Sequence, residues 1–570
     1  MAANVAAILK RRSELRAERD QYASLWQEIA EHVIPHKSNI IRLLSPGEKQ
    51  TRELFDSTAI HGSETLAASI HGTLTPGTQP WLSLKVRQEE LNDNGEVKDW
   101  LEDCARRIHA ALRQSNWTTS VHEMYLDLVG PAGMGCLFVE EKAPPAAGTF
   151  GGFRFSTHGP GEYTVSEDAE GRIDTVFREM RLTARAIAMK WPGKGGDKVQ
   201  EAARNKPEER YTVLHAVYPR EDYSASEKKR GSLNMAWASC YLVVETRAKL
   251  DEGGFPEHPF MTPRWAKTSG EVYGRGPSHT ALPDVKTLNK VKEFLLQAAP
   301  LAMFPPTLEA DDAVIGEPDL TPAGRNVVNT MGGRSIDELF RFMQTGVKID
   351  VSQIIIGDLR QSIRDMYFSH QLELQDKPAM TATEVQVRYE LMQRILGPTL
   401  GRLETEFLNP LVERCFALMA RAGALLPAPD VLMQQGGEQA DLDIQYEGPL
   451  ARAQRTVELT AQDRVLSFVA ALTQAMVAAG VPPTQAAAVW DVLKVDKWLR
   501  DRSEITGIRA DSLNSVEETT QIRSDRAQAE QQAAQMQQAQ QMAEIAQKGA
   551  PMLKALHEAS TNGGQQPEAA

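Results

Sequence analysis

The sequence predicts an α+β protein that is predominantly helical and consists of several structural units. Its 570 residues exceed what one hydrophobic core usually serves, so roughly three or four units are expected. Apolar residues recur at helical spacing in both halves of the chain. Between Cys136 and Phe260 the pattern changes to short strand-like pieces separated by Gly, Pro and Asp. Apolar residues make up 42% and charged residues 24% of the chain, so most of it should fold.

The N-terminal part is expected to contain three helices and an antiparallel sheet. The first helix covers residues 2–34 and stops at Pro35, since proline removes a backbone donor. The other two cover residues 96–112 and 121–129. The strands after them should form one sheet with one covered face, interrupted by a short helix that Thr183 caps.

Two further helices are predicted to enclose a small mixed module. The first follows Gly274-Arg275-Gly276-Pro277, carries Pro283 in its first turn and ends at Pro300. The second covers residues 350–368, and the Asp at its start can cap it. The segment between them is rich in Pro, Gly and Asp and should contain a short helix at residues 336–342.

The C-terminal part is predicted to be mainly helical. A polar stretch at residues 369–378 precedes the longest helix, which begins at the capping box Thr381-Ala382-Thr383-Glu384 and kinks at Gly397-Pro398. A short strand, LDIQY, then leads to helices at residues 450–477 and 483–499. The end of the chain is rich in Gln, Ala and Glu; a helix of this kind is marginal alone, but copies bundled around a ring could stabilise one another.

Several classes of protein are disfavoured by what the sequence lacks. No run of about eighteen apolar residues is present, and the charged N-terminus does not resemble a signal peptide, so a cytosolic protein without membrane contact is expected. The four cysteines lie far apart without a CxxC pair and should be reduced and buried: Cys104, Cys136, Cys240 and Cys415. The net charge of −13 argues against sequence-specific DNA binding, but it suits a conduit that attracts DNA only weakly.

No motif of a common catalytic class is present, so the sequence indicates a protein that is not an enzyme and needs no cofactor. It has no GxxxxGK[ST] phosphate loop, no HExxH, no GxSxG elbow and no GxGxxG after a strand. His32 and His36 are four residues apart, but a proline lies between them, and two surface histidines explain them better than a metal pair. Glu309, Asp311 and Asp312 are better explained as a solvated loop than as a cation site. No metal site is predicted.

Basic residues mark the two helices around the module. Lys286 and Lys290 share one face of the first helix, next to Lys292, and Arg360 and Arg364 share one face of the second, because residues four apart are neighbours on a helix. Contact with phosphate is one interpretation. Ion pairs, including pairs with a neighbouring subunit, or a solvated face are the more common alternative.

Four separated phrases of the sequence resemble the portal, or head-to-tail connector, family of podovirus-type short-tailed bacteriophages, and together they extend over nearly the whole chain. Four phrases in the right order are hard to obtain by chance. In chain order they are Leu54-Phe55-Asp56-Ser57-Thr58-Ala59 with Leu66-Ala67-Ala68, His71-Gly72-Thr73-Leu74-Thr75-Pro76-Gly77 and Trp81; Val272-Tyr273-Gly274-Arg275-Gly276-Pro277 with Ala281-Leu282-Pro283-Asp284 and Leu288-Asn289; Met380-Thr381-Ala382-Thr383-Glu384-Val385; and Pro449-Leu450-Ala451-Arg452-Ala453-Gln454.

The resemblance implies the portal fold, assembled as a closed ring. Combined with the boundaries predicted above, it gives a wing at residues 1–279, a stem at 280–299 and 351–368, a clip at 300–350, a tunnel loop at 369–381, a long kinked wing helix and strand at 382–449, a crown at 450–512, and a helical barrel with a flexible tail at 513–570.

The resemblance also implies a function. A ring of about twelve copies would sit at one capsid vertex of the virion after assembly in the host cytoplasm. It would nucleate procapsid assembly with the major capsid and scaffolding proteins, dock the terminase large subunit, conduct double-stranded DNA during packaging and ejection, and bind tail adaptor or nozzle proteins. The candidate DNA-channel residues are then Lys286, Lys290, Arg360, Arg364, Gln375 and Lys377. The alternative is a cytosolic helical scaffolding or structural assembly protein through which no DNA passes.

Overall fold

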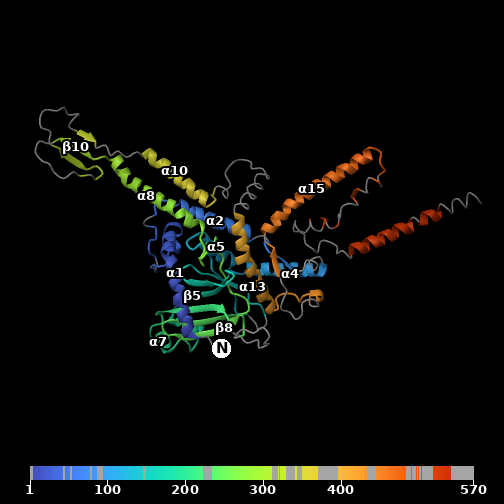
Figure 1. The fold of residues 1–570 in the computed structure, drawn as a ribbon, viewed down its shortest axis with the longest axis horizontal. Helices are drawn as coiled ribbons and strands as arrows, with labels where there is room; N and C mark the ends of the chain where they lie inside the picture. Colours follow the sequence, from blue (N-terminus) through green and yellow to red (C-terminus); the bar gives the residue numbers. More distant parts are fainter. Residues whose placement is uncertain are drawn as a thin grey trace, which may run out of the picture. The chain divides into compact units, whose positions relative to one another are not determined.

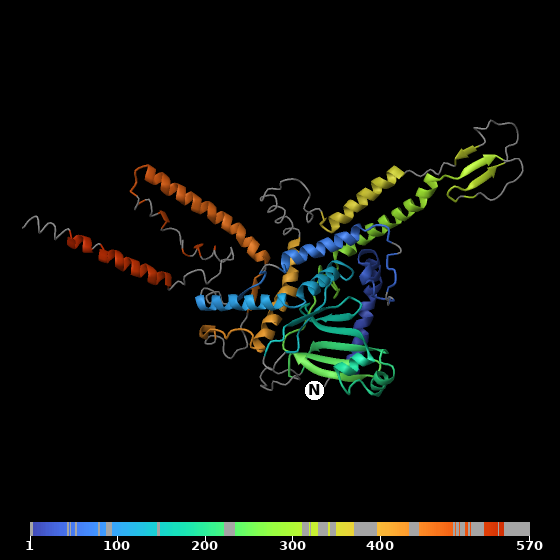
Figure 2. The ribbon, with the colours of Figure 1, turned by 180° about the vertical axis from the view of Figure 1, so that it is seen from behind.

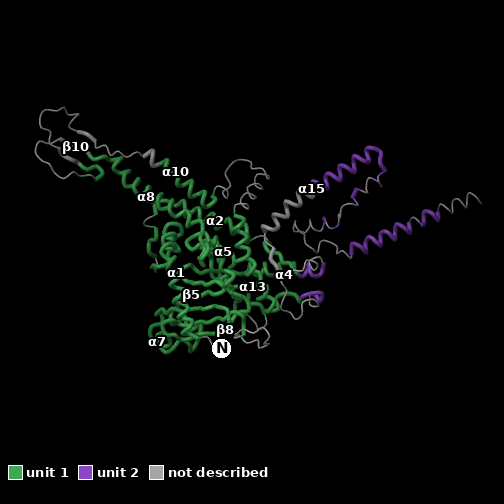
Figure 3. The backbone as a smooth tube through the Cα atoms, in the orientation of Figure 1, with its two compact units in different colours: residues 1–87, 101–427, 439–453 green, residues 88–100, 428–438, 454–570 purple. Residues whose placement is uncertain are grey.

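Figure 1 shows the computed structural model of the chain, and Figure 2 shows it from behind. The structure describes residues 4–42, 45, 47–51, 54–77, 80–86, 94–144, 149–221, 234–310, 319, 321–328, 340–342, 349–369, 396–432, 444–447, 449–482, part of 485–502, 518–533 and 535–540. Two compact units are coloured separately in Figure 3: residues 1–87, 101–427 and 439–453 form unit 1, and residues 88–100, 428–438 and 454–570 form unit 2. The fold is α+β and mainly helical, as predicted.

The predicted N-terminal helices are confirmed, with small shifts of their ends. Asn4 caps the first of them, because its Oδ1 accepts the backbone N–H of Ala6 at 3.1 Å. The helix stops before Pro35, as expected. An additional helix, α2, was not predicted. The N-terminal helices are α1 (Val5–Val33), η1 (Pro35–Lys37), α2 (Thr58–Leu74), α4 (Gly95–Arg113) and α5 (Trp117–Val129).

Two antiparallel sheets follow, where the sequence predicted one. The smaller has the order β3-β2-β9 and the larger the order β4-β5-β6-β7-β8. The strands are β2 (Leu137–Glu141), β3 (Phe153–Thr157), β4 (Tyr163–Glu167), β5 (Ile173–Thr183), β6 (Arg210–Pro219), β7 (Trp237–Val243), β8 (Ala248–Phe255) and β9 (Phe260–Met261).

Both faces of the five-stranded sheet are covered, so the prediction of a single covered face is wrong. On one face Leu15 of α1 packs against Leu214. On the other face, α6 (Ala184–Lys190) and α7 (Asp197–Asn205) cover Val213, while the smaller sheet covers the neighbouring part. The nearly continuous burial of β6 is the sign of a strand enclosed on both sides. Thr183 caps α6 as predicted.

Helices α8 (Pro277–Met303) and α10 (Ile349–Met366) pack against each other. The predicted start of α8 after residue 279 and its end at Pro300 are wrong, because Pro283 and Pro300 both lie inside the helix. An interior proline removes one hydrogen bond, but the buried apolar face of α8 stabilises the helix around Pro283. Helix α10 begins one residue before Asp350, so this residue lies within the helix and does not precede it.

Between α8 and α10 the chain forms a small β module. Strand β10 (Thr307–Ala310) pairs in parallel with β11 (Arg325–Val328) and antiparallel with β12 (Phe340–Phe342). The predicted module is therefore present, but its described part consists of strands. The predicted helix at 336–342 is wrong for its last three residues, whose two aromatic side chains favour a strand; residues 336–339 lie outside the described part.

The C-terminal part contains a helix with a π-helical turn. Residues 396–403 are helical and continue into η2 (Glu404–Leu408), the π-helical turn, and α13 (Asn409–Arg421). The start of the predicted long helix falls in residues 370–395, outside the described part, and Gly397-Pro398 lie within helical residues.

A strand and further helices follow in the sequence. The predicted strand is β13 (Ile444–Glu447), which pairs antiparallel with β1 (Ser83–Val86). Helix α15 (Pro449–Ala478) matches the prediction of 450–477, and residues 518–533 and 535–540 are helical. Among the described helices none combines the length and the apolar character that a membrane span requires.

Candidate functional site: the helix pair and its base

The helix pair α8 and α10 projects from the body of unit 1 and holds the β module at its far end (Figures 1 and 2). The chain runs outward along α8 and returns along α10, so the two helices are antiparallel. The pair is anchored at its base. There both helices contact α2, and α8 also contacts α1.

The start of α8 is fixed by close backbone packing. Pro277 occupies the first turn, where its missing N–H costs nothing, and the side chain of His279 accepts the Gly276 N–H at its Nδ1, at 3.1 Å. Glycine is required at two positions. A Cβ on Gly274 would lie 2.2 Å from the carbonyl oxygen of Gly133, and one on Gly133, at φ +59°, would lie 2.3 Å from the nitrogen of Gly276.

The cap that His279 provides predicts a pH-dependent stability. Burial, with a smaller effect of Arg275, lowers the pKa of His279 to about 4. Since an unfolded histidine has a pKa of about 6.5, the unfolded chain binds the extra proton first, and stability is lost as pH falls from about 6.5 to 4. We expect a loss of about 1–2 kcal/mol between pH 7 and pH 5.

The variant His279→Gln tests this cause, because glutamine at the third helical position also accepts the cap N–H but does not titrate. Urea denaturation at pH 7 and pH 5 should show a smaller difference for the variant than for the wild type. Replacing the exposed His61 with Asn should leave the difference unchanged. An equal difference in wild type and His279→Gln would contradict the prediction.

Asp56 joins both helices of the pair to the segment before α2. Its side chain is 4% exposed; its Oδ2 lies 2.7 Å from Lys292 Nζ of α8 and 2.9 Å from Arg360 Nη2 of α10. The Thr58 N–H donates to its Oδ1 at 2.8 Å, and Asn289 accepts the backbone N–H of Asp56 at 3.0 Å. Burial would raise the pKa of Asp56, but the hydrogen bonds from Lys292, Thr58 and Arg360 hold it at about 2. We call this group the Asp56 clamp.

A second contact lies nearer the start of α8. Ser278 Oγ donates to the carbonyl oxygen of Val129 at 2.7 Å and lies 2.8 Å from the hydroxyl of Tyr367. The ring of Tyr367 packs against Gly62 of α2. Together with the clamp, this contact fixes both helices against the body.

The structure separates the basic residues that the sequence proposed for the DNA channel. Lys286 forms an ion pair with Glu28 of α1. Lys290 pairs with Glu293 at 2.8 Å and lies over the ring of Phe294.

The other predicted channel residues differ in what the structure says of them. Arg360 belongs to the Asp56 clamp. Arg364 is exposed and forms no ion pair with a residue that the structure describes. Gln375 and Lys377 lie outside the described residues. Nothing in these contacts tests DNA binding.

The remaining candidate residues are placed as follows. The His32 ring contacts the carbonyl oxygen of Glu28 at 2.9 Å, within its own helix. Asp311 and Asp312 lie outside the described part. All four cysteines are free and buried, as predicted.

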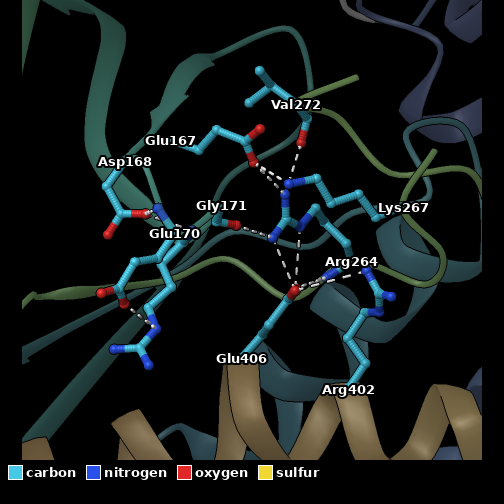
Figure 4. A network of polar contacts seen from close by, with 10 residues as sticks. Glu167, Asp168, Glu170, Gly171, Arg264, Lys267, Val272, Arg402 and Glu406 are labelled. Atoms are coloured by element: carbon cyan, nitrogen blue, oxygen red, sulfur yellow. Dashed lines mark hydrogen bonds and ion pairs between the residues drawn. The ribbon is translucent and has the colours of Figure 1, made fainter. Parts of the chain in front are cut away.

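Arg264 lies at the centre of a polar network in the body, which Figure 4 shows. Its side chain is 3% exposed. It donates to Glu406 of the π-helical turn at 2.9 Å, to Glu167 of β4 at 3.0 Å, and to the carbonyl oxygens of Gly171 and Val272 at 2.9 and 3.3 Å. The Arg264 backbone N–H also donates to Glu406, at 2.9 Å.

Two further cations complete this network. Lys267 Nζ donates to Glu167 at 2.6 Å, and Arg402 lies 3.9 Å from Glu406. Burial would raise the pKa of Glu167, but Lys267 and Arg264 lower it. Neither this network nor the Asp56 clamp is predicted by the sequence. Asp56 does lie in the first phrase that carries the family resemblance, and its place in that phrase is the sequence signal that could have indicated its importance.

Comparisons with known proteins agree with one another over most of the chain. The family model of the bacteriophage head to tail connecting protein matches residues 5–513. The chain is 30% identical over 545 residues to the "Probable portal protein" of Bordetella phage BPP-1, with 92% of each chain covered. It is 26% identical over 558 residues to the "Portal protein" of Salmonella phage epsilon15, with 96% of this chain and 94% of that one covered.

Two further matches are shorter or weaker. The "Portal protein" of Pseudomonas phage phiKMV is 24% identical over 265 residues, 45% of this chain and 47% of that one. A chain from the solved virion of a native gene transfer agent particle superposes with a TM-score of 0.31 at 10% identity, covering 80% of this chain and 99% of that one. From the match over residues 5–513, this chain belongs to the family of bacteriophage head to tail connecting proteins.

Proposed function

We propose that the chain is the portal subunit of a short-tailed phage, which forms a closed ring of about twelve copies at one capsid vertex. In this proposal α8 and α10 form the stem, the β10–β12 module forms the clip, and residues 369–381 form the tunnel loop. The clip docks the terminase large subunit during packaging and tail adaptor proteins afterwards, and double-stranded DNA passes along the ring axis in both directions. Capsid and scaffolding proteins are the partners during assembly.

The observation that carries the proposal is the apolar surface of the distal half of the helix pair. Six large apolar side chains are exposed there in the single chain, although most residues of this kind are buried in folded proteins. They are Phe294 (56% exposed), Leu296 (58%), Met303 (75%), Phe304 (62%), Ile354 (65%) and Ile355 (43%). Ring closure, in which each copy covers its neighbour, supplies a partner for such a surface.

The base of the pair differs from its distal half. There the apolar face of α8 is buried against the body, for example at Val285 and Leu288. A stem that is anchored at one end and exposed along the rest can contact neighbouring copies while its module remains available to other proteins. This arrangement suits a connector better than a compact enzyme.

The test is the assembly state of the purified full-length chain. Electron microscopy should show rings with an open axial channel. In Leu296→Glu and Ile354→Glu, rings should be lost while circular dichroism shows an unchanged helix content, because a charge would be buried without a partner. We expect the association constant at each contact to fall at least about a hundredfold.

A matched control lies one residue further along α8. Gln297→Glu adds the same charge at an exposed position without removing an apolar side chain, and its rings should persist. Rings that form equally well in Leu296→Glu would exclude the helix pair as the subunit contact. Closed assemblies without a channel would favour the alternative, a scaffolding protein through which no DNA passes.

A further inference from the structure

Arg264 lies where three parts of unit 1 meet. Glu167 belongs to the five-stranded sheet, Glu406 belongs to the π-helical turn, and Val272 belongs to the loop that leads into α8. In Figure 4 the side chains of Glu167 and Glu406 approach the guanidinium group from different sides. Because a guanidinium group presents its donors in a rigid fork, the positions of these three parts are fixed relative to one another.

The π-helical turn corrects the phase of the helix that contains it. Upstream of the turn Leu396, Leu400 and Leu403 are buried; downstream the buried residues are Leu411, Val412, Arg414, Cys415, Leu418 and Met419. At about 100° per residue, an uninterrupted α-helix would turn the downstream set roughly 90° away from the upstream set. One extra residue in a π-helical turn offsets about this angle, which keeps both sets near one face of the helix.

The loop between Arg264 and α8 has little freedom to move. The Trp265 N–H donates to the carbonyl oxygen of Gly133 at 2.8 Å, and the Arg275 N–H donates to that of Ala266 at 2.9 Å. Gly274 is in close backbone contact with the same Gly133. A displacement of Arg264 would therefore move the first residues of α8.

The two ends of the helix around the turn are held by separate contacts. Downstream, Glu257 accepts hydrogen bonds from Arg414 at 2.9 Å and from Arg421 at 2.9 Å. At the turn itself, Glu406 is the residue that binds Arg264. Residues 409–421 are thus held to the body by Glu257, whereas the Arg264–Glu406 contact joins the turn that follows residues 396–403 to the body.

We propose that Arg264 is a positioning residue that couples the helix preceding the π-helical turn to the start of α8, through Glu406. Its biological use rests on the proposed function: the tunnel loop assigned there precedes this helix in the sequence, so the coupling would link that part of the chain to the stem. A shift of either part would then be transmitted to the other through one buried arginine.

Hydrogen exchange on the full-length chain tests the coupling. In Glu406→Gln, amide exchange should become at least about tenfold faster in residues 396–403 and in residues 265–276, because a hydrogen bond between two charged groups has been weakened. Exchange in β5 to β7 and in residues 409–421 should stay unchanged. Arg264→Lys, which keeps the charge but loses the forked geometry, should give the same pattern.

Glu257→Gln is the matched control, since it weakens a similar contact at the other end of the same helix. It should accelerate exchange near Arg414 and leave residues 396–403 and 265–276 unchanged. Acceleration of residues 396–403 alone, or an equal acceleration throughout unit 1 in both variants at Glu406 and Arg264, would overturn the coupling. The absence of rings in the wild type would count against the proposed function and leave the exchange comparison intact.

Discussion

Replacement of Gly274 by alanine is expected to prevent stable folding of unit 1. The added Cβ would lie 2.2 Å from the carbonyl oxygen of Gly133 and 3.0 Å from its carbon. These are backbone atoms, and the same carbonyl group accepts the Trp265 N–H, so neither side can move away without breaking the entry to α8. We expect a loss of more than about 4 kcal/mol in the free energy of unfolding, seen as a loss of soluble protein or of its cooperative urea transition.

The control for this prediction is Gly357→Ala in α10. A Cβ at Gly357 meets no atom within 4 Å, and alanine is preferred to glycine inside a helix by about 1 kcal/mol. This variant should be as stable as the wild type or more stable. If Gly274→Ala unfolds at the same urea concentration as the wild type, the close contact between residues 274 and 133 is not needed for the fold.

The second large effect is expected from Asp56→Ala. The substitution leaves Lys292 and Arg360 without the carboxylate that lies 2.7 and 2.9 Å from them, and removal of one partner of a buried ion pair costs about 3–5 kcal/mol. Arg360 is 40% exposed, so water compensates it partly, and about 3 kcal/mol is expected. Urea denaturation at pH 7 measures this loss.

The pKa of Asp56 also predicts how this stabilisation depends on pH. The pKa is about 2 in the folded chain, below the ordinary value of 3.8. The stabilisation from the carboxylate is therefore fully present above pH 3.8 and is lost as pH falls towards 2. Asp284→Ala, which removes the acceptor for Ser362, should cost about 1 kcal/mol. Equal losses of unfolding free energy in the two variants would show that the Asp56 clamp stabilises the fold no more than the Asp284–Ser362 hydrogen bond does.

The sequence predicted most helices because their signals are local. Pro35 ends α1 and Thr183 caps α6, and each signal acts within one helical turn. Proline misled the prediction where packing outweighs it: Pro283 and Pro300 lie inside α8. The second cover of the five-stranded sheet was missed because strand periodicity does not identify the element that packs on each face.

The contacts of the candidate site could not be predicted for a different reason. Arg360 and Asp56 are joined across 304 positions of the sequence, and the basic spacing on a helix shows a shared face but not the partner of that face. The π-helical turn leaves one weak signal in the sequence. The apolar residues change their helical phase between Leu403 and Leu411, so a single uninterrupted helix would place them on different faces. Family resemblance supplied the order of the parts, and only the structure supplied the contacts between them.

The buried cysteines have a practical consequence for measuring distances in the assembly. Burial raises the pKa of the thiols of Cys104 and Cys415 to about 12 and that of Cys240 to about 11, and it raises that of Cys136 as well. The thiolate is the form that attacks maleimides and thiol-directed nitroxide reagents, so all four native sulfurs should react slowly near neutral pH. The unmodified chain is therefore a ready background in which one introduced surface cysteine carries nearly all of a fluorophore or spin label.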